Sequence, residues 1–463
     1  MRRSSHGSRL PSRDERMGIK IGIVSLGCAK NLADSEVILG CLREGGFEVA
    51  EHLDEAQVVI VNTCAFIAEA ERESAGTIRR LEELRARGEI RRLVVAGCLP
   101  ARRGADVAAT FPGVDRFILP PDIPHAAEIV RAALSEGQAA PGAVGEAGFL
   151  AGRRSPRVRL TPPHYAYVKI GEGCDNRCSY CVIPSIRGAA RSRSADSIVG
   201  EARRLAAEGV REINLISQDT TAYGNDRPGE EGLPALLTRL ARIRGLRWIR
   251  LLYGHPARYT DELLRVIAGE PRICRYVDFP LQHASDRVLR MMGRRMTKAQ
   301  AARRLERVRL LVPGVTVRTT CMVGFPGETE REFEELLGFV REARFEHLGA
   351  FAYSREKGTA AARMERQVPA RVKRERLHRL MTLQQGIVRE SLERMLGRDA
   401  EVMVDERLDE GSFPLRGRTA GDAPEVDGSV YLSGNDAAPG EIVTVRITGM
   451  MEYDLVGAVR CKL

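Results

Sequence analysis

Residues 165–181 read YAYVKIGEGCDNRCSYC, an apolar run followed at once by a glycine-containing loop. The loop carries Cys174, Cys178 and Cys181 at the spacing C-x3-C-x2-C. In α/β proteins, ligand-binding groups lie in the loops that follow the carboxyl ends of parallel strands. The stretch therefore predicts an α/β fold with a metal site at one edge of its sheet.

Strand and helix patterns alternate from this loop to Tyr353. Six strands are expected, at residues 165–170, 210–216, 248–252, 276–279, 315–320 and 348–353. Helical patterns intervene at residues 196–207, 233–243, 261–267, 299–311 and 330–342. A closed TIM barrel has eight such units. The sequence therefore predicts a partial (β/α)6 barrel.

The three cysteines of the loop have the spacing of an iron–sulfur site. Three thiolates can bind three irons of a [4Fe–4S] cluster and leave the fourth iron open to an external ligand. Zinc is the alternative, but a structural zinc site needs four ligands, commonly from paired cysteines. The sequence has no second pair nearby, and His164 would have to reach across a strand. The pattern favours the cluster.

A second set of cysteines precedes this region. Residues 19–134 alternate between strand and helix patterns, which predicts a Rossmann-like parallel sheet covered by helices. Three cysteines each directly follow a predicted strand: Cys28 in SLGCAKN, Cys64 in VNTCAF and Cys98 in AGCLP. Buried core cysteines would be the simpler interpretation. The repeated position at strand ends instead predicts that the three thiols converge on a second cluster.

Length and composition bound the remaining organisation. The chain has 463 residues, which suggests about three domains, and no run reaches the ~18 apolar residues of a membrane span. Residues 1–17 lack the apolar core of a secretion signal and are expected to be a disordered basic tail. With reduced thiols, the protein is expected in the cytoplasm. The expected domains are 18–134, a linker at 135–163, the barrel at 164–392 and a C-terminal domain at 393–463.

The C-terminal domain differs from the rest in both pattern and charge. Short alternating segments between turns predict a small, OB-like antiparallel β-barrel. The chain carries a net charge of +10, but residues 399–463 hold 13 acidic against 6 basic side chains. Acidic pairs at 405–406 and 409–410 and acids within 422–427 suggest a face that attracts a basic partner and repels nucleic acid.

The cysteine loop resembles the CX3CXΦC motif of the radical S-adenosylmethionine enzymes, with Tyr180 as the aromatic residue. The resemblance implies that S-adenosylmethionine chelates the open iron and is cleaved to a 5′-deoxyadenosyl radical, a reaction supplied by the cofactor. The segment VGFPGE resembles the family's adenine-contacting stretch, which would make Gly324, Gly327 and Glu328 cofactor contacts. An ordinary strand-to-helix turn gives the same letters.

The three parts together, from Met17 to Leu463, resemble the methylthiotransferases. The resemblance implies that Cys28, Cys64 and Cys98 hold an auxiliary [4Fe–4S] cluster that supports the transferred sulfur, while Cys174, Cys178 and Cys181 hold the radical-generating cluster. It also implies that the C-terminal barrel is a TRAM domain. One S-adenosylmethionine would supply the methyl group and a second would supply the radical. An electron donor of flavodoxin or ferredoxin type is the implied partner.

Two stretches resemble the RimO branch of that family: ISQDTTAYG at 216–224 and PLQHASDRVLRMM at 280–292. This branch modifies the β-carbon of an aspartate in small-subunit ribosomal protein twelve. Gln218 and Gln282 would be cofactor contacts, with turn capping or site lining as the alternatives. Methylthiolation of tRNA adenosine is the alternative function within the family. A two-cluster electron-transfer protein is the alternative of another class, although an electron carrier needs no six-unit barrel.

Overall fold

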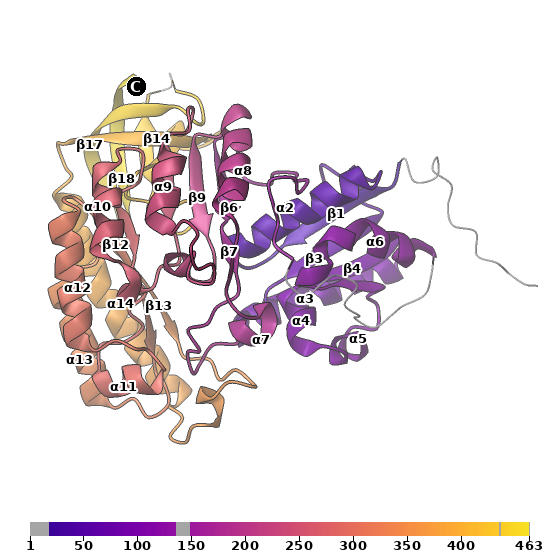
Figure 1. The fold of residues 1–463 in the computed structure, drawn as a ribbon, viewed down its shortest axis with the longest axis horizontal. Helices are drawn as coiled ribbons and strands as arrows, with labels where there is room; N and C mark the ends of the chain where they lie inside the picture. Colours follow the sequence, from indigo (N-terminus) through magenta and orange to yellow (C-terminus); the bar gives the residue numbers. More distant parts are fainter. Residues whose placement is uncertain (1–17, 136–148, 435–436, 463) are drawn as a thin grey trace, which may run out of the picture. The chain divides into compact units, whose positions relative to one another are not determined.

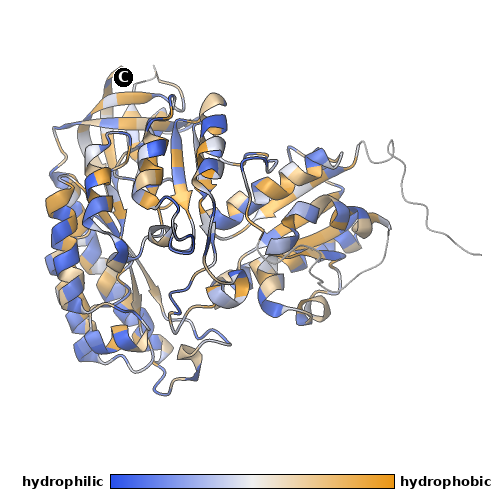
Figure 2. Ribbon diagram, in the orientation of Figure 1, coloured by the Kyte–Doolittle hydropathy of each residue, from blue (hydrophilic) through white to orange (hydrophobic). Residues whose placement is uncertain are grey.

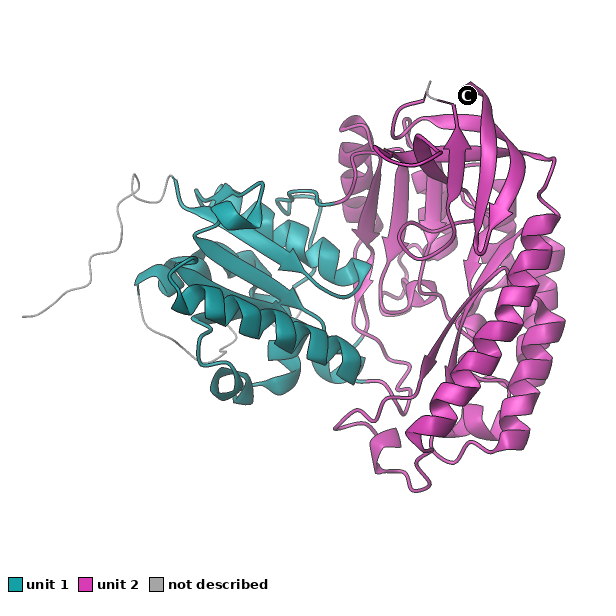
Figure 3. Ribbon diagram, turned by 180° about the vertical axis from the view of Figure 1, so that it is seen from behind, with its two compact units in different colours: residues 1–160, 182–189 teal, residues 161–181, 190–463 magenta. Residues whose placement is uncertain are grey.

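The computed structural model describes residues 18–135, 149–434 and 437–462 (Figure 1). The chain forms two compact units, residues 1–160 with 182–189 and residues 161–181 with 190–463 (Figure 3). The predicted tail, residues 1–17, and residues 136–148 of the predicted linker lie outside the described residues. The chain passes from unit 1 to unit 2 at Thr161, returns at Val182 and leaves again at Ala190.

Unit 1 contains a five-stranded sheet, and all of its strand pairs are parallel. The order is β2-β1-β3-β4-β5, from β2 (Glu48–Val49), β1 (Lys20–Ser25), β3 (Val58–Thr63), β4 (Arg92–Gly97) and β5 (Arg116–Ile118). Its helices are α2 (Ala29–Glu44), α3 (Ala68–Ala86), α4 (Cys98–Arg103), α5 (Asp106–Thr110), α6 (Ala126–Ser135) and α7 (Ile183–Arg187). The buried residues form two apolar clusters, which confirms the Rossmann-like prediction.

Some elements of unit 1 differ from the sequence prediction. After β4 the chain forms two short helices, α4 and α5, in place of one longer helix, because Gly104 between them has φ +57°. Residues 149–160 of the predicted linker have no regular structure, yet Phe149, Ala151 and Val158 pack against the core. Arg157 pairs with the buried Glu36 of α2. This part of the linker is therefore a component of unit 1.

Unit 2 contains the six predicted parallel strands. They are β6 (Tyr165–Lys169), β9 (Glu212–Ile216), β10 (Trp248–Leu251), β11 (Tyr276–Asp278), β12 (Thr316–Val323) and β13 (His347–Ala352). Between them lie α8 (Ala195–Ala207), α9 (Leu233–Ala241), α10 (Asp261–Gly269), α11 (Asp286–Met291), α12 (Lys298–Leu311) and α13 (Glu330–Ala343). The outer helices α12 and α13 carry many hydrophilic residues (Figure 2), while the inner faces join one large apolar cluster. This confirms the partial (β/α)6 barrel.

The barrel strands form two three-stranded sheets, β10-β9-β6 and β11-β12-β13. The two sheets are joined where the amide of Cys274 donates to the carbonyl of Ile249 at 2.9 Å. Beyond them, α14 (Ala370–Glu393) leads to the C-terminal domain. The chain there forms a closed barrel in the order β14-β15-β16-β18-β17. Its strands are β14 (Asp399–Arg407), β15 (Leu415–Thr419), β16 (Val430–Ser433), β17 (Ile442–Met451) and β18 (Asp454–Lys462).

Three acidic residues of the C-terminal barrel pair with the larger barrel, which corrects part of the sequence-based hypothesis, while Asp409 and Glu410 are exposed as that hypothesis requires. Asp405 lies 2.9 Å from His164, just before β6. Asp427 accepts a 2.7 Å hydrogen bond from Tyr276 of β11. Asp422 contacts His347 of β13 at 3.2 Å. These carboxylates pair with the amino-terminal ends of the barrel strands, the end of such barrels that serves stability rather than chemistry.

Buried arginines complete this junction between the two barrels of unit 2. Glu212 of β9 is fully buried and pairs with Arg250 at 3.1 Å and with Arg418 of β15 at 2.5 Å. Arg250 also donates to the carbonyl of Ala420 at 2.8 Å. Removing one member of such a buried set costs several kcal/mol, because its partner keeps an uncompensated charge. The turn at 419–427 therefore covers the amino-terminal ends of the (β/α)6 barrel strands.

We predict that His347 makes this junction pH-dependent. Burial lowers its pKa, but the hydrogen bond to Asp422 and the charges of Asp427 and Asp422 outweigh burial and raise the pKa to about 9. The stabilisation is full below about pH 6.5 and is lost as the pH rises through 9. His347→Gln should therefore lower the free energy of unfolding at pH 6 by on the order of 2 kcal/mol and by far less at pH 10, as measured by denaturant titration at each pH. An equal loss at both pH values, compared with the exposed-ring control His125→Gln, would contradict the assignment.

Candidate functional site

The loop with Cys174, Cys178 and Cys181 lies directly after β6 and β7 (Gly171–Glu172) in unit 2. Ser179 fixes it to the end of α11: its amide donates to the carbonyl of Met292 at 2.9 Å and its hydroxyl to that of Met291 at 2.7 Å. The carbonyl of Ser179 accepts from the amide of Ala361 at 2.8 Å. The backbone and the hydroxyl of Ser179 thus hold the loop in place.

A polar clamp holds the same loop from the ends of β9 and β10. Asn176 donates to Asp219 at 2.7 Å, and Arg258 donates to both Asn176 and Asp219 at 2.8 and 2.6 Å. Thr221 donates to the other oxygen of Asp219 at 2.6 Å. Asp219 therefore orients the cysteine loop and the turn that follows β9.

Tyr180, the aromatic residue of the motif, anchors the loop by apolar packing. It lies against a buried cluster that includes Met292, Phe325 and Tyr353. Burial raises the pKa of its hydroxyl well above the usual value. The ring is a packing group rather than an acid or base. Its packing fixes the positions of Cys178 and Cys181.

Two glutamines follow the ends of β9 and β11: Gln218 is half-buried and Gln282 is buried. The side-chain nitrogen of Gln218 donates to the carboxylate of Glu172. The backbone amide of Gln282 donates to the carbonyl of Thr320 at 2.8 Å. The side-chain oxygens of both glutamines are buried without a hydrogen-bond partner in the described part of the chain. Gln282 also has φ +72°, a strained conformation for a residue other than glycine. Unpaired acceptors and strain together mark a binding region.

The VGFPGE segment is shaped by its own glutamate. Glu328 accepts from the amide of Phe325 at 2.9 Å and from Arg376 of α14 at 2.9 Å. Burial, which outweighs the charge of Arg376, raises the pKa of Glu328 to about 7. Gly324 and Gly327 have φ +72° and +76°, which only glycine adopts without strain. Glu328 thus holds the turn, and the amide of Gly327 donates to the carbonyl of Arg366 at 2.8 Å.

The second triad is assembled by strand register in unit 1. Thr63 of β3 pairs with Gly97 of β4, so Cys64 and Cys98 follow at the same level. β1 pairs with β3 beside them and ends three residues before Cys28. A Cβ added to Gly27 would lie only 3.0 Å from the sulfur of Cys64. The strand pairing therefore places all three cysteines at one edge of the sheet, near enough for the charges of Cys28 and Cys98 to act on Cys64; the cluster they would hold stays a prediction.

The electrostatics of this triad favour thiolates unequally. Burial raises the pKa of Cys64 to about 11 and also raises that of Cys98, although Arg187 opposes the latter shift. The pKa of Cys28 is lowered, because Lys30, the Asn31 amide and Arg187 outweigh its burial. Cys28 caps α2 and Cys98 begins α4, positions where a helix terminus favours negative charge. A metal is needed to hold all three as thiolates.

Neither triad forms a single-ion site. Among the described residues, no three His, Cys, Asp or Glu side chains lie close enough to bind one metal ion. A [4Fe–4S] cubane has no such requirement, because each thiolate binds a different iron.

The sequence did not reveal the polar groups that support the second triad, Cys28, Cys64 and Cys98. Asn31 donates to the carbonyls of Leu26 and Thr63 at 3.0 and 2.7 Å, which joins the loops before Cys28 and Cys64. Arg187 reaches Cys98 from α7. The only available signal was the position of Asn31 three residues after Cys28. Nothing local distinguished Arg187 among the many arginines of the chain.

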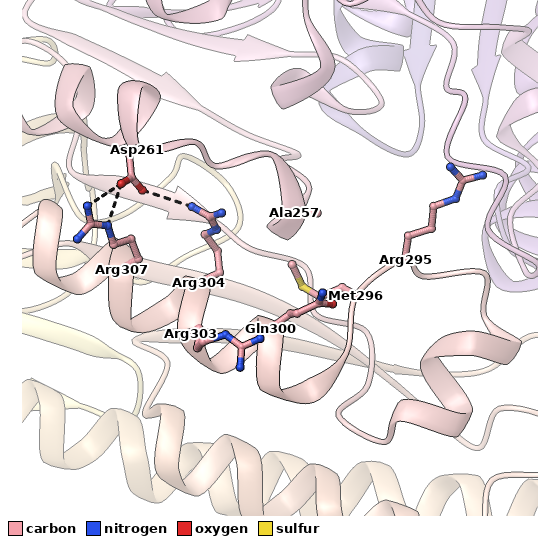
Figure 4. A pocket seen from close by; sticks show the side chains of 8 residues that line it. All are labelled: Ala257, Asp261, Arg295, Met296, Gln300, Arg303, Arg304 and Arg307. Carbon is pink, nitrogen blue, oxygen red and sulfur yellow. Dashed lines mark hydrogen bonds and ion pairs between the residues drawn. The ribbon is translucent and has the colours of Figure 1, made fainter.

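An arginine-lined cavity of about 430 Å³ lies elsewhere in unit 2, beside α12 (Figure 4). Asp261 pairs with Arg307 at 2.6 Å and with Arg304 at 3.5 Å. None of the predicted site residues lines this cavity.

Of the other cysteines, Cys274 and Cys321 are buried and their pKa values are raised to about 11 and 12 by burial. No described helix is both long and apolar enough to cross a membrane.

Comparisons with known proteins agree with this architecture. Three family models match the chain: uncharacterized protein family UPF0004 at residues 20–118, the radical SAM superfamily at 168–340 and a TRAM domain at 396–459. A ribosomal protein uS12 methylthiotransferase RimO from Pelotomaculum thermopropionicum is 48% identical and covers 95% of this chain and 99% of its own length. The chain belongs to the RimO family. The RimO of Geobacter sulfurreducens is 46% identical, over 95% of this chain and 98% of its own.

A solved structure resembles the same fold. The radical S-adenosylmethionine methyltransferase TsrM from Kitasatospora setae has a TM-score of 0.54 at 17% identity, over 72% of this chain and 73% of its own. This likeness supports the fold assignment of the RimO chain.

We predict that Gly27 of this RimO chain tolerates no side chain. Gly27 has φ +92°, and an added Cβ would lie 2.6 Å from the Cβ of Cys64. Gly88 has φ +78° but has open space around it. Gly27→Ala and Gly88→Ala share a backbone cost of about 1–2 kcal/mol, and only Gly27→Ala adds an overpacking cost of about 1–3 kcal/mol. Thermal unfolding should therefore show a clearly larger loss for Gly27→Ala; equal losses would refute this packing.

Proposed function

We propose that this chain methylthiolates the β-carbon of an aspartate in ribosomal protein uS12. The observation that carries the proposal is the joint presence of two three-cysteine sites, each at the carboxyl ends of parallel strands, in a member of the RimO family. Transfer of a sulfur-containing group makes the protein a transferase. It would act in the cytoplasm, where uS12 is made, with a flavodoxin- or ferredoxin-type electron donor.

The residues present fit two iron–sulfur clusters and S-adenosylmethionine. Cys174, Cys178 and Cys181 would hold the radical-generating [4Fe–4S] cluster, and Cys28, Cys64 and Cys98 would hold the auxiliary one. Three thiols per site leave one iron open for a ligand. When bound, the clusters and S-adenosylmethionine supply the electron, the radical and the methylthio group that no side chain can supply.

The protein's own groups position the cofactor and the reacting carbon. The unpaired oxygens of Gln218 and Gln282 would accept hydrogen bonds from the amino or hydroxyl groups of S-adenosylmethionine. The backbone of the Gly324–Glu328 turn would contact its adenine, with Glu328 holding the turn in shape. The apolar cluster around Tyr180 would exclude water from the reactive centre. No side-chain acid or base is assigned.

The two alternatives fit the chain less well. Methylthiolation of tRNA adenosine uses the same chemistry, but the relatives at 46–48% identity are named for uS12. A two-cluster electron-transfer protein would need neither the six-unit barrel nor the unpaired acceptors at its strand ends. The ion-paired carboxylates of the TRAM domain no longer provide an argument for either substrate, because they face the barrel.

We predict that the substrate is a protein and not tRNA. The anaerobically reconstituted chain, incubated with reductant, S-adenosylmethionine, 30S subunits and bulk tRNA, should add a methylthio group to uS12 only. Mass spectrometry of the separated ribosomal proteins and of digested tRNA measures both products. Efficient modification of tRNA adenosine would overturn the choice of substrate, and release of no 5′-deoxyadenosine would favour the electron carrier.

We predict that Cys178 is required for radical generation. Two [4Fe–4S] clusters correspond to about eight irons per chain. Cys178→Ala should lower this content to about four and abolish 5′-deoxyadenosine release, because the remaining two thiols of the loop cannot retain the cluster. Iron analysis and chromatography of the reaction products measure both. Cys321→Ala, a buried cysteine outside both sites, is the matched control and should keep all of the iron.

We predict the complementary result for Cys64. Cys64→Ala should also lower the iron content to about four per chain, but 5′-deoxyadenosine release should persist at least in part. Transfer to uS12 should vanish, because the auxiliary site would no longer support the sulfur. A Cys64→Ala variant with undiminished methylthio-uS12 formation would show that this triad is structural.

A further inference from the structure

Arg187 is the only arginine for which the structure gives a hydrogen bond to a cysteine sulfur of unit 1 within the described residues. It lies at the end of α7, six residues after Cys181, in the segment 182–189 that belongs to unit 1. We propose that Arg187 is a positioning residue that sets the reduction potential of the auxiliary cluster. The inference rests on the proposed function, which assigns a cluster to Cys28, Cys64 and Cys98.

The guanidinium of Arg187 contacts three different groups. One terminal nitrogen lies 2.7 Å from a carboxylate oxygen of Asp34. The other donates to the side-chain oxygen of Asn31 at 2.9 Å and to the sulfur of Cys98 at 3.3 Å. The side chain of Arg187 is 2% exposed and that of Asp34 is 9% exposed. A planar group with several donors is suited to this arrangement, and a lysine is not.

The burial of this arginine needs an explanation beyond stability. Taking a charged pair out of water costs several kcal/mol per ion, and a well-packed apolar pair is often as stable. Asp34 compensates the charge but accepts only part of the hydrogen-bonding capacity of Arg187. Its other terminal nitrogen is directed at Asn31 and at the thiol of Cys98, a proposed cluster ligand. The neighbouring apolar residues of α7's segment, Val182 and Ile186, pack into the core of unit 1 and fix the start of the side chain.

The contact has a defined chemical consequence for a bound cluster. Hydrogen bonds to ligating sulfurs and nearby positive charge stabilise the more negative, reduced state and raise its potential. Arg187 also fixes the amide of Asn31, whose nitrogen joins the loops before Cys28 and Cys64. One side chain therefore influences both the electron density at Cys98 and the spacing of the triad.

The test uses the full chain with Cys174, Cys178 and Cys181 replaced by alanine, so that only the auxiliary cluster contributes. In this background, Arg187→Lys keeps the charge near Asp34 but cannot make all three contacts. We expect retained iron and a midpoint potential, followed by electron paramagnetic resonance, that shifts to more negative values. Arg85→Lys is the matched control: Arg85 forms a two-pronged pair with the buried Asp115, and no hydrogen bond given for it involves a triad cysteine.

A second variant gives the opposite sign and does not depend on the first one folding. Asp34→Asn removes the negative charge that compensates Arg187 while the contact with Cys98 remains, so the potential should shift to more positive values. Unchanged potential and resonance spectrum in either variant would overturn the role of Arg187. Failure of the alanine background itself to bind iron would instead overturn the auxiliary cluster and the proposed function with it.

Discussion

Hydrogen-bond pairing between parallel strands determines where the cysteines of both sites lie. Parallel strands all end at the same edge of a sheet, so residues distant in sequence meet there once the register is set. In unit 1 the pairing of Thr63 with Gly97 brings Cys64 level with Cys98. In unit 2 the pairing of β6 with β9 brings the cysteine loop beside Asp219, which clamps it. A shift of one residue in either register would separate the groups.

The partial barrel divides its two ends between different tasks. The carboxyl ends carry the cysteine loop, the unpaired glutamine oxygens and the strained Gln282. The amino-terminal ends carry Glu212 and its buried arginines, and the turn at 419–427 covers them. Charged side chains at these strand starts need partners once they are buried. The C-terminal barrel supplies the missing partners at one end and leaves the other end available for chemistry.

The sequence allowed the fold, and the position of the cysteines at strand ends, to be predicted because both depend on local patterns. Apolar runs identify strands, and a cysteine directly after such a run identifies a strand end. The contacts of charged residues could not be predicted in the same way. The acids of residues 399–463 read as a solvated face, since their partners, such as His347 and Tyr276, come from other parts of the chain. Arg187 was missed for the same reason: its partners Asn31 and Cys98 lie 156 and 89 residues away.

The return of residues 182–189 to unit 1 has a consequence for how the protein is made. The sheet of unit 1 is complete in sequence at Ile118, yet part of its core, Val182 and Ile186, is translated only after the cysteine loop. A ribosome that has released residues 1–160 has produced every strand of this unit but not the arginine that faces Cys98. The N-terminal cysteines therefore acquire their final environment only after Cys174, Cys178 and Cys181 have emerged. The path of the chain therefore makes the core of unit 1 complete only after part of unit 2 has been synthesised.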